Sequence, residues 1–243
     1  MVPGKADPIP SSGPHRVRGS AAAQRCRQGR QARSGGNGAR VTSASLGNVA
    51  VVGAGDVVSS TLARRLDTSV LDAAATLPAV LDGIVVVTGA DAAPTSLQSS
   101  GSGEWQRLAR EPLWQTICIF QHAWMSMQNH GGRIVLVVPT IGMAGSPQLV
   151  PLTTMVEGAR ALAKSAARQW AGSGVIVNIV GVPLTLLAPQ LADKAQHLTA
   201  PAIADHSTLL DDIATTIAHL LRRDIGHLIG QTIVVDGGSV MVP

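Results

Sequence analysis

A glycine pair at the end of an apolar run carries the clearest chemical signal in this sequence. Gly53 ends the apolar run Val49–Gly53, Gly55 follows two residues later, and a helical segment comes next. A G-x-G turn between a strand and a helix lets the backbone approach a pyrophosphate at the helix N-terminus. Asp72 lies 19 residues after Gly53, near where a ribose-binding carboxylate belongs. The spacing leaves alternatives open at both sites. The glycines can form a purely structural turn, and Asp72 can form a surface turn or a helix cap.

The glycine pattern is incomplete. In the pattern G-x-G-x-x-G, Val58 replaces the third glycine, and we expect a valine side chain to crowd an approaching pyrophosphate. Asp56 adds a negative charge beside a position meant for phosphate. The sequence therefore predicts a weakened dinucleotide site, or none.

Other chemistry finds little support in the sequence. The seven histidines show no metal-ligand spacing, so no metal site is expected. The chain contains neither a G-x-S-x-G nucleophile turn nor a G-K-[ST] phosphate loop. Four tryptophans and one phenylalanine are too few and too scattered for a nucleic-acid stacking platform.

Strand-like and helix-like segments alternate along most of the chain. The strand-like runs are apolar throughout, as in strands that are covered on both faces. These runs are Val49–Gly53, Gly83–Thr88, Arg133–Val138, Val175–Val180 and Thr232–Val235. The clearest helical segments are Ser59–Leu66, Glu157–Trp170 and Asp211–Arg223. This order predicts an α/β fold with a single doubly wound parallel sheet.

Residues 1–45 differ from the rest in composition. Residues 1–40 hold eight basic residues and one acid, whereas the other 203 residues hold eleven basic and fourteen acidic ones. The segment is rich in Gly, Ser, Arg, Pro and Ala without apolar periodicity, so we expect a disordered basic tail before a domain at residues 46–243. A misassigned start codon, with translation beginning near Val41, is an alternative explanation. The folded part is slightly acidic and is not expected to bind nucleic acid.

Three segments carry a family resemblance. Gly226–Val240 contains the run G-Q-T-I-V-V-D-G-G, and Gly131–Pro147 reads G-G-R-I-V-L-V-V-P-T-I-G-M-A-G-S-P. Glu157–Trp170 is followed shortly by S-G-V-I-V-N-I-V. These segments are similar to the closing strand, the central strand with its loop, and the next helix and strand of the short-chain dehydrogenase/reductase family. The resemblance covers roughly residues 48–243 and is nearest to β-ketoacyl carrier-protein reductases. It implies a Rossmann-like domain that uses NAD or NADP.

The resemblance also implies where the catalytic residues belong. In the family a tyrosine donates a proton, a lysine four residues later lowers the tyrosine pKa, a serine orients the carbonyl, and an asparagine anchors a water relay. The corresponding positions here are Gln115 for asparagine, Pro139 for serine, Leu152 for tyrosine and Val156 for lysine. The chain has no tyrosine at all. The nearby hydroxyls are those of Thr140, Thr153 and Thr154, which are far weaker acids than a phenol. We therefore expect no catalytic residue.

The same comparison predicts an eroded cofactor site. The family's T-G-x-x-x-G-x-G corresponds to V-G-A-G-D-V-V-S at Val52–Ser59, and its N-N-A-G corresponds to T-G-A-D at Thr88–Asp91. Only 35 residues separate Gly53 from Thr88, about half the family's usual length, so the nucleotide-binding half is expected to be shortened, with Ser69–Asp72 as a short strand. The weak candidates for cofactor contact are Gly53, Gly55, Asp72, Thr88 and Gly89. NAD(P) is expected to bind weakly or not at all.

Retained packing and lost chemistry predict a non-catalytic or regulatory subunit of a homo- or hetero-oligomer. By the resemblance, helices near Gln115–Met127 and Glu157–Trp170 would pair with another copy or with an active paralogue. The small side chains of Ala159, Ala163, Ala166 and Ala167 would allow close approach, unless they face this chain's own sheet. The alternatives are a divergent NAD(P)-dependent oxidoreductase or ketoreductase, a nucleotide or acyl-ligand sensor, and a decaying gene product without a role.

Two further expectations concern the surroundings of the protein. No apolar run approaches the ~20 residues that span a bilayer, so we expect a cytoplasmic protein without a membrane partner. The apolar loop Leu184–Ala204 corresponds, by the resemblance, to the family's substrate lid.

Overall fold

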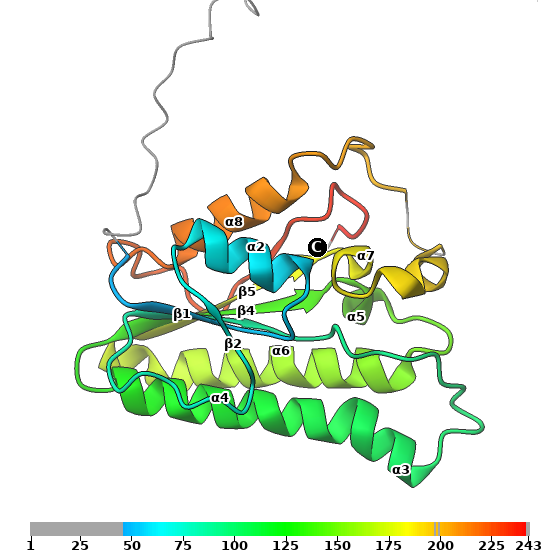
Figure 1. Cartoon of the computed structure of the whole chain (residues 1–243), viewed down its shortest axis with the longest axis horizontal. Coiled ribbons are helices and arrows are strands. Elements are labelled where there is room, and N and C mark those ends of the chain that lie inside the picture. Colours follow the sequence, from blue (N-terminus) through cyan, green and yellow to red (C-terminus); the bar gives the residue numbers. More distant parts are fainter. Residues whose placement is uncertain (1–45, 197, 199, 242–243) are drawn as a thin grey trace, which may run out of the picture. The chain divides into compact units, whose positions relative to one another are not determined.

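A single parallel sheet organises residues 46–196, 198 and 200–241, which the computed structural model describes (Figure 1). Within them the strand order is β2-β1-β3-β4-β5-β6, and every neighbouring pair is parallel. The strands are β1 Val49–Val52, β2 Val70–Leu71, β3 Gly83–Val87, β4 Gly132–Pro139, β5 Val175–Val182 and β6 Thr232–Val234. The prediction of an α/β, doubly wound parallel sheet is therefore confirmed.

Helices cover both faces of this sheet. The longer ones are α2 Val57–Arg65, α4 Glu111–Met127, α6 Val150–Trp170 and α8 Leu209–Leu220. The shorter ones are α3 Ser102–Trp105, η2 Gln106–Arg110, α5 Ile141–Ala144, η3 Ala171–Ser173, α7 Leu184–Leu187 and η4 Pro189–Ala195. Figure 1 shows α4 and α6 below the sheet and α2 and α8 above it. Two apolar clusters result, one on each face, and they bury every residue of β3, β4 and β5.

Helix α6 begins seven residues before the predicted start at Glu157, because Pro151 lies in its first turn, where a proline fits a helix. Its predicted alanine stripe is confirmed. Ala159, Ala163, Ala166 and Ala167 are all buried in this chain's own core against the sheet. Their suggested role in contact with a second subunit is therefore wrong, and the alternative, that they face the chain's own sheet, holds.

The predicted shortening between β1 and β3 is present. The predicted strand Ser69–Asp72 is only the two-residue edge strand β2, and residues 72–82 contain no helix. The end of α8 also differs from prediction, because Arg222 and Arg223 lie beyond its last residue and pair with Asp224 and Asp82. The tail expected at residues 1–45 lies outside the described residues, so the tail and the domain boundary stay predictions. No described helix is both long and apolar enough to cross a membrane.

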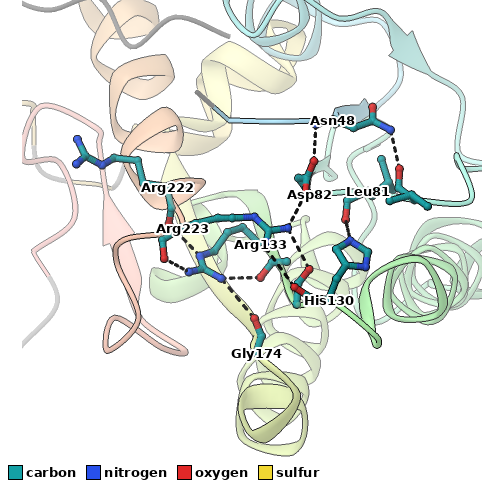
Figure 2. A network of polar contacts seen from close by, with 11 residues as sticks. Asn48, Leu81, Asp82, His130, Arg133, Gly174, Arg222 and Arg223 are labelled. Atoms are coloured by element: carbon teal, nitrogen blue, oxygen red, sulfur yellow. Dashed lines mark hydrogen bonds and ion pairs between the residues drawn. The ribbon is translucent and has the colours of Figure 1, made fainter. Parts of the chain in front are cut away.

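A buried arginine, Arg133, connects several segments at the edge of the sheet where the strands begin (Figure 2). The guanidinium of Arg133, in β4, donates hydrogen bonds to five backbone carbonyl oxygens, those of Gly132, Gly174, Arg222, Arg223 and Ile225, at 2.9–3.4 Å. Burial lowers the pKa of Arg133. The side chain thereby fixes the turn after α8 against the starts of β4 and β5.

A second group of contacts continues this network toward β1. Asp82 accepts a hydrogen bond from the backbone N–H of Asn48 at 2.7 Å and pairs with Arg223, and both contacts lower its pKa. The ring of His130 bonds the carbonyl oxygen of Leu81 at 3.0 Å. The segments before β1, β3 and β4 are therefore joined by side chains as well as by the sheet (Figure 2).

We expect Arg133→Met to lower the free energy of unfolding by about 3 kcal/mol, because it leaves buried carbonyl groups without donors. Urea denaturation followed by tryptophan fluorescence measures the change. Arg168→Met is the matched control, because Arg168 is exposed on α6 and should change stability by less than about 0.5 kcal/mol. Equal stability of the two variants would contradict a structural role for the Arg133 network.

Candidate functional site

A cavity of about 230 Å³ lies at the carboxyl edge of β1 and β3. Ligands of open parallel sheets bind at this edge, where loops leave the strands. The cavity brings together five residues that the sequence singled out: Gly53, Asp72, Thr88, Gly89 and Gln115. Gly55, the other predicted contact, is exposed and does not line it. Most of the predicted positions are therefore neighbours in space.

Both glycines of the turn have structural reasons for their identity. Gly55 has φ +74°, a conformation that other residues rarely adopt. At Gly53 a Cβ atom would lie 2.7 Å from the Cβ of Ser59 and 3.3 Å from the Cβ of Val87. The turn therefore needs glycine whether or not a ligand binds, which agrees with the structural alternative.

Asp56 occupies the N-terminus of α2 with its own carboxylate. One oxygen accepts hydrogen bonds from the backbone N–H groups of Val58, at 2.8 Å, and Ser59, at 3.0 Å. The other accepts from the Ser59 hydroxyl at 3.1 Å. An N-cap carboxylate satisfies the unpaired donors of the first turn and interacts favourably with the helix dipole. These are the donors that a bound phosphate would use at a helix N-terminus.

The expectation that Val58 crowds a pyrophosphate is wrong. Val58 is fully buried in the cluster between the sheet, α2 and α8, so its side chain points into the core. Its neighbour Val57 is half exposed at the start of the helix. The obstacle at this helix end is therefore the Asp56 carboxylate rather than a valine.

Asp72 makes the local turn that the sequence left open as one of its two uses, and it also lines the cavity. It follows β2, and one carboxylate oxygen accepts a hydrogen bond from the N–H of Ala74 at 2.8 Å, which makes a local turn. The residue is exposed and lines the cavity, so its second oxygen is available to a ligand. The turn is a described contact, whereas ribose binding stays a prediction.

Apolar side chains back the cavity where α6 and β4 approach it. Gly89, with φ +97°, lies against Pro139 and Leu152: a Cβ there would be 2.7 Å from Cδ of the proline and 3.8 Å from Cδ1 of the leucine. Leu152 and Val156 are both buried in the core beneath α6. The nearest polar contact is weak, from the Thr88 hydroxyl to the sulfur of Met155 at 3.9 Å.

Known proteins share this sequence and fold. A model described as enoyl-(acyl carrier protein) reductase, from the short-chain dehydrogenase/reductase family, matches residues 29–240. The chain belongs to the short-chain dehydrogenase/reductase family. It is 27% identical over 207 residues to the short-chain dehydrogenase/reductase eriH of Hericium erinaceus, covering 82% of this chain and 79% of that protein.

Two further likenesses are more limited in extent. The chain is 32% identical over 128 residues to the 3-oxoacyl-(acyl-carrier-protein) reductase FabG of Staphylococcus aureus, which covers 51% of this chain and about half of FabG (52%). The solved structure "ElxO with NADP Bound" matches with a TM-score of 0.59 at 17% identity, over 79% of this chain and 98% of that one. At that identity the structural match supports the fold alone.

The apolar side chains behind the cavity can be compared with the catalytic residues of the family. The sequence resemblance predicts that Pro139, Leu152 and Val156 hold the positions of the family's serine, tyrosine and lysine, and this alignment stays a prediction. None of the three has a side-chain group that can donate or accept a proton. Of the nearby threonines, Thr153 donates its hydroxyl hydrogen bond to the carbonyl of Val150 at 3.2 Å, in its own helix. The described residues around the family's catalytic position thus offer packing rather than acid–base chemistry.

The charges around this cavity bear on the predicted weak or absent binding of NAD(P). Among the described residues, the charged side chains that line it are those of Asp72 and Asp91, and the Asp56 carboxylate caps the nearby helix end. The lysines of residues 46–241 lie elsewhere: Lys164 is exposed on α6, and Lys194 pairs with Asp193 at 2.8 Å. An anionic pyrophosphate at the N-terminus of α2 would therefore meet carboxylates and no cation among the described residues of the cavity, and weak or absent NAD(P) binding stays a prediction.

Two larger cavities lie farther along the same edge. One of about 340 Å³ lies beside Thr140 and under the segment that includes α7 and η4, where the substrate lid was expected. Another, of about 590 Å³, lies between the N-terminus of α8, the end of β6 and residues 202–209. Asp236 lines both cavities, but its carboxylate already accepts hydrogen bonds from the backbone N–H groups of Gly238, Ser239 and Val240. Within the described residues no cluster of His, Cys, Asp or Glu could hold a metal.

The sequence does not predict either cavity, because its one signal there is the apolar character of the loop Leu184–Ala204. The V-D-G-G run marks the end of the last strand, but nothing in the sequence indicates that this strand end lies beside that loop. Both cavities depend on contacts between segments far apart in the chain, and no local pattern marks such contacts.

We expect Gly53→Ala to destabilise the fold by about 1–3 kcal/mol, because the new methyl group would overlap the Ser59 side chain. The double variant Gly53→Ala/Ser59→Gly should lose less than the sum of the two single variants, because Ser59→Gly removes the overlapping atoms. Chemical denaturation of all four proteins completes the cycle. Strict additivity would contradict direct packing of this turn against α2.

Proposed function

We propose that this short-chain dehydrogenase/reductase has lost oxidoreductase chemistry and works in the cytoplasm as a non-catalytic or regulatory subunit of an oligomer. One observation supports the proposal: Leu152 and Val156, to which the resemblance assigns the positions of the family's tyrosine and lysine, are buried aliphatic side chains. Carbonyl reduction needs a proton donor whose pKa is matched to the operating pH. Neither side chain can supply or tune such a donor.

The hydroxyl groups near this wall do not replace the missing phenol. An aliphatic alcohol is a much weaker acid, and no described lysine or histidine lines the cavity of about 230 Å³ beside Thr88. Thr140 lines the neighbouring cavity of about 340 Å³, which His206 also lines. Thr140, next to Pro139, is buried, and its backbone N–H bonds the carbonyl of Val182 at 2.8 Å, which places it in the loop between β4 and α5. These contacts support a structural role for the threonines.

The outer face of α4 supports an interface with another subunit. Trp114 is 60% exposed and Met125 is 65% exposed, although large apolar side chains are usually buried. Trp114, Leu113 and Ile117 also line a surface cavity of about 320 Å³ between η2 and α4. This face lies within the predicted interface segment Gln115–Met127 or directly before it.

Aromatic packing makes α4 and α6 a rigid base for such an interface. The rings of Trp124 and Trp170 are stacked with centroids 5.2 Å apart, and Phe120 lies 6.3 Å from Trp170. The two helices are therefore joined before any partner arrives, which lowers the ordering cost of association. The partner is a second copy of this chain or an active paralogue that the chain modulates.

A divergent NAD(P)-dependent oxidoreductase or ketoreductase is the second candidate. The cavity that keeps Gly53, Thr88 and Gly89 together, and the similarity to FabG, favour it. It requires a hydroxyl such as that of Thr140 to act as the acid. A ligand sensor that uses the same cavity without chemistry is a further alternative.

We expect the purified protein to show no oxidation of NADPH or NADH with acetoacetyl coenzyme A, because the aliphatic side chains of Leu152 and Val156 cannot donate a proton to the product. Absorbance of the reduced nicotinamide measures turnover, and Staphylococcus aureus FabG serves as the active control. Turnover that Thr140→Val abolishes would contradict the proposal and establish the divergent enzyme. Thr153→Val is the matched control, because that hydroxyl already bonds its own helix.

We expect light scattering after size exclusion to give a dimer or larger assembly, and Trp114→Glu to dissociate it, because a charge would replace an exposed apolar anchor. Val57→Glu is the control, since Val57 is 51% exposed but lies on the other face of the sheet. A monomeric wild-type protein at micromolar concentration would contradict the homo-oligomer and leave an active paralogue as the remaining partner. Dissociation by both variants would contradict an interface on α4.

A further inference from the structure

The cavity at the carboxyl edge of β1 and β3 has the walls of a ligand site but the wrong charge for a phosphate. We propose that it binds an uncharged or cationic ligand of nucleoside size, and that the Asp56 carboxylate excludes phosphate esters by taking their place at the N-terminus of α2. This inference goes beyond the subunit role and does not depend on it. It assigns the cavity a ligand class different from the family's dinucleotides.

The first step is the occupation of the helix end. The backbone N–H groups of Val58 and Ser59 and the Ser59 hydroxyl all donate to Asp56. An incoming phosphate would have to displace a covalently tethered carboxylate from these donors. The tether makes the local concentration of that carboxylate very high, so a free anion competes poorly.

The second step is the charge of the cavity wall. Asp72 and Asp91 are its only charged residues, and neither has a basic side-chain partner among the described residues. Opposite charges attract and like charges repel, most strongly in a partly enclosed site. The wall therefore disfavours anions and favours neutral or positively charged groups.

The third step is the supply of unused polar groups. The side chains of Asp91 and Gln115 make no hydrogen bond to any described residue, and Asp72 uses only one of its oxygens. Two carboxylates and an amide oxygen accept hydrogen bonds from hydroxyl or amino groups. They are arranged around one cavity and thus suit a ligand with several such donors, as a nucleoside has.

The fourth step is the shape of the remaining wall. Val52, Ile119 and Met155 line the cavity with apolar surface, and such surface suits the flat face of a heterocyclic ring. The volume of about 230 Å³ is below the ~300–1,000 Å³ of most drug-sized ligand pockets. It is therefore too small for a dinucleotide but adequate for one heterocyclic base with its sugar, or for a short amine.

Calorimetry of the full chain with adenosine, AMP and NADH tests the inference. We expect saturable binding of adenosine below millimolar concentration, and AMP about tenfold weaker or worse, because its phosphate meets only carboxylates. Asp91→Asn should weaken adenosine binding. Absence of adenosine binding up to millimolar concentration, or AMP or NADH binding as tightly as adenosine, would overturn the proposal.

The role of Asp56 has its own variant and control. Asp56→Asn keeps a good helix cap but removes the charge, so AMP should bind at least about fivefold more tightly while adenosine binding is unchanged. Asp67→Asn is the matched control: it removes an equal charge just beyond the other end of α2, where φ is +55° and asparagine is tolerated. Equal AMP affinities of the two variants would overturn the role of Asp56. Nicotinamide turnover and light scattering test the subunit proposal separately, so either proposal can fail alone.

Discussion

The structure depends on the burial of a parallel sheet on both faces. Every residue of β3, β4 and β5 is buried, so their backbone groups need partners in neighbouring strands or adjoining segments, and their side chains need apolar partners above and below. The alanine face of α6 meets this need on one side, and Val58 with the apolar face of α8 meets it on the other. The carboxyl edge, where the cavity lies, is open because the strands end there. Packing therefore places the site without requiring any residue that performs chemistry.

This separation allows the family's fold to persist whether or not its residues perform chemistry. The resemblance predicts that Leu152 and Val156 hold the positions of the family's tyrosine and lysine, two polar residues that need solvent or hydrogen-bond partners. Here both side chains are aliphatic and join the core beneath α6. Such replacements remove the cost of holding polar groups beside an apolar wall. The sheet and its helices lose nothing by the change, and packing alone gives no reason to restore the polar residues.

The sheet could be predicted from the sequence because short, continuously apolar runs are typical of strands that are buried on both faces. Strand positions, the short β2 and the alanine stripe of α6 all follow from local composition and period. The start of α6 at Val150 was missed because Pro151 and the two threonines after it resemble a loop, although proline is favoured in a first helical turn. The Arg133 network was also missed, since it joins residues about ninety positions apart through backbone carbonyls, which carry no side-chain signature. At the site, the charge of Asp56 was noticed, but its capping geometry required coordinates.

Asp56 shows how one residue can stabilise a fold and limit a function by the same contacts. A helix N-terminus needs acceptors for its first N–H groups, and nucleotide-binding proteins of this fold leave that need to the ligand. When the chain supplies a carboxylate there, α2 is complete without any ligand, and the helix gains stability in the absence of cofactor. The same backbone N–H groups are then no longer free to donate hydrogen bonds to a phosphate. Because these contacts complete the first turn of α2 without a ligand, the stability of this helix end does not depend on the concentration of a cofactor.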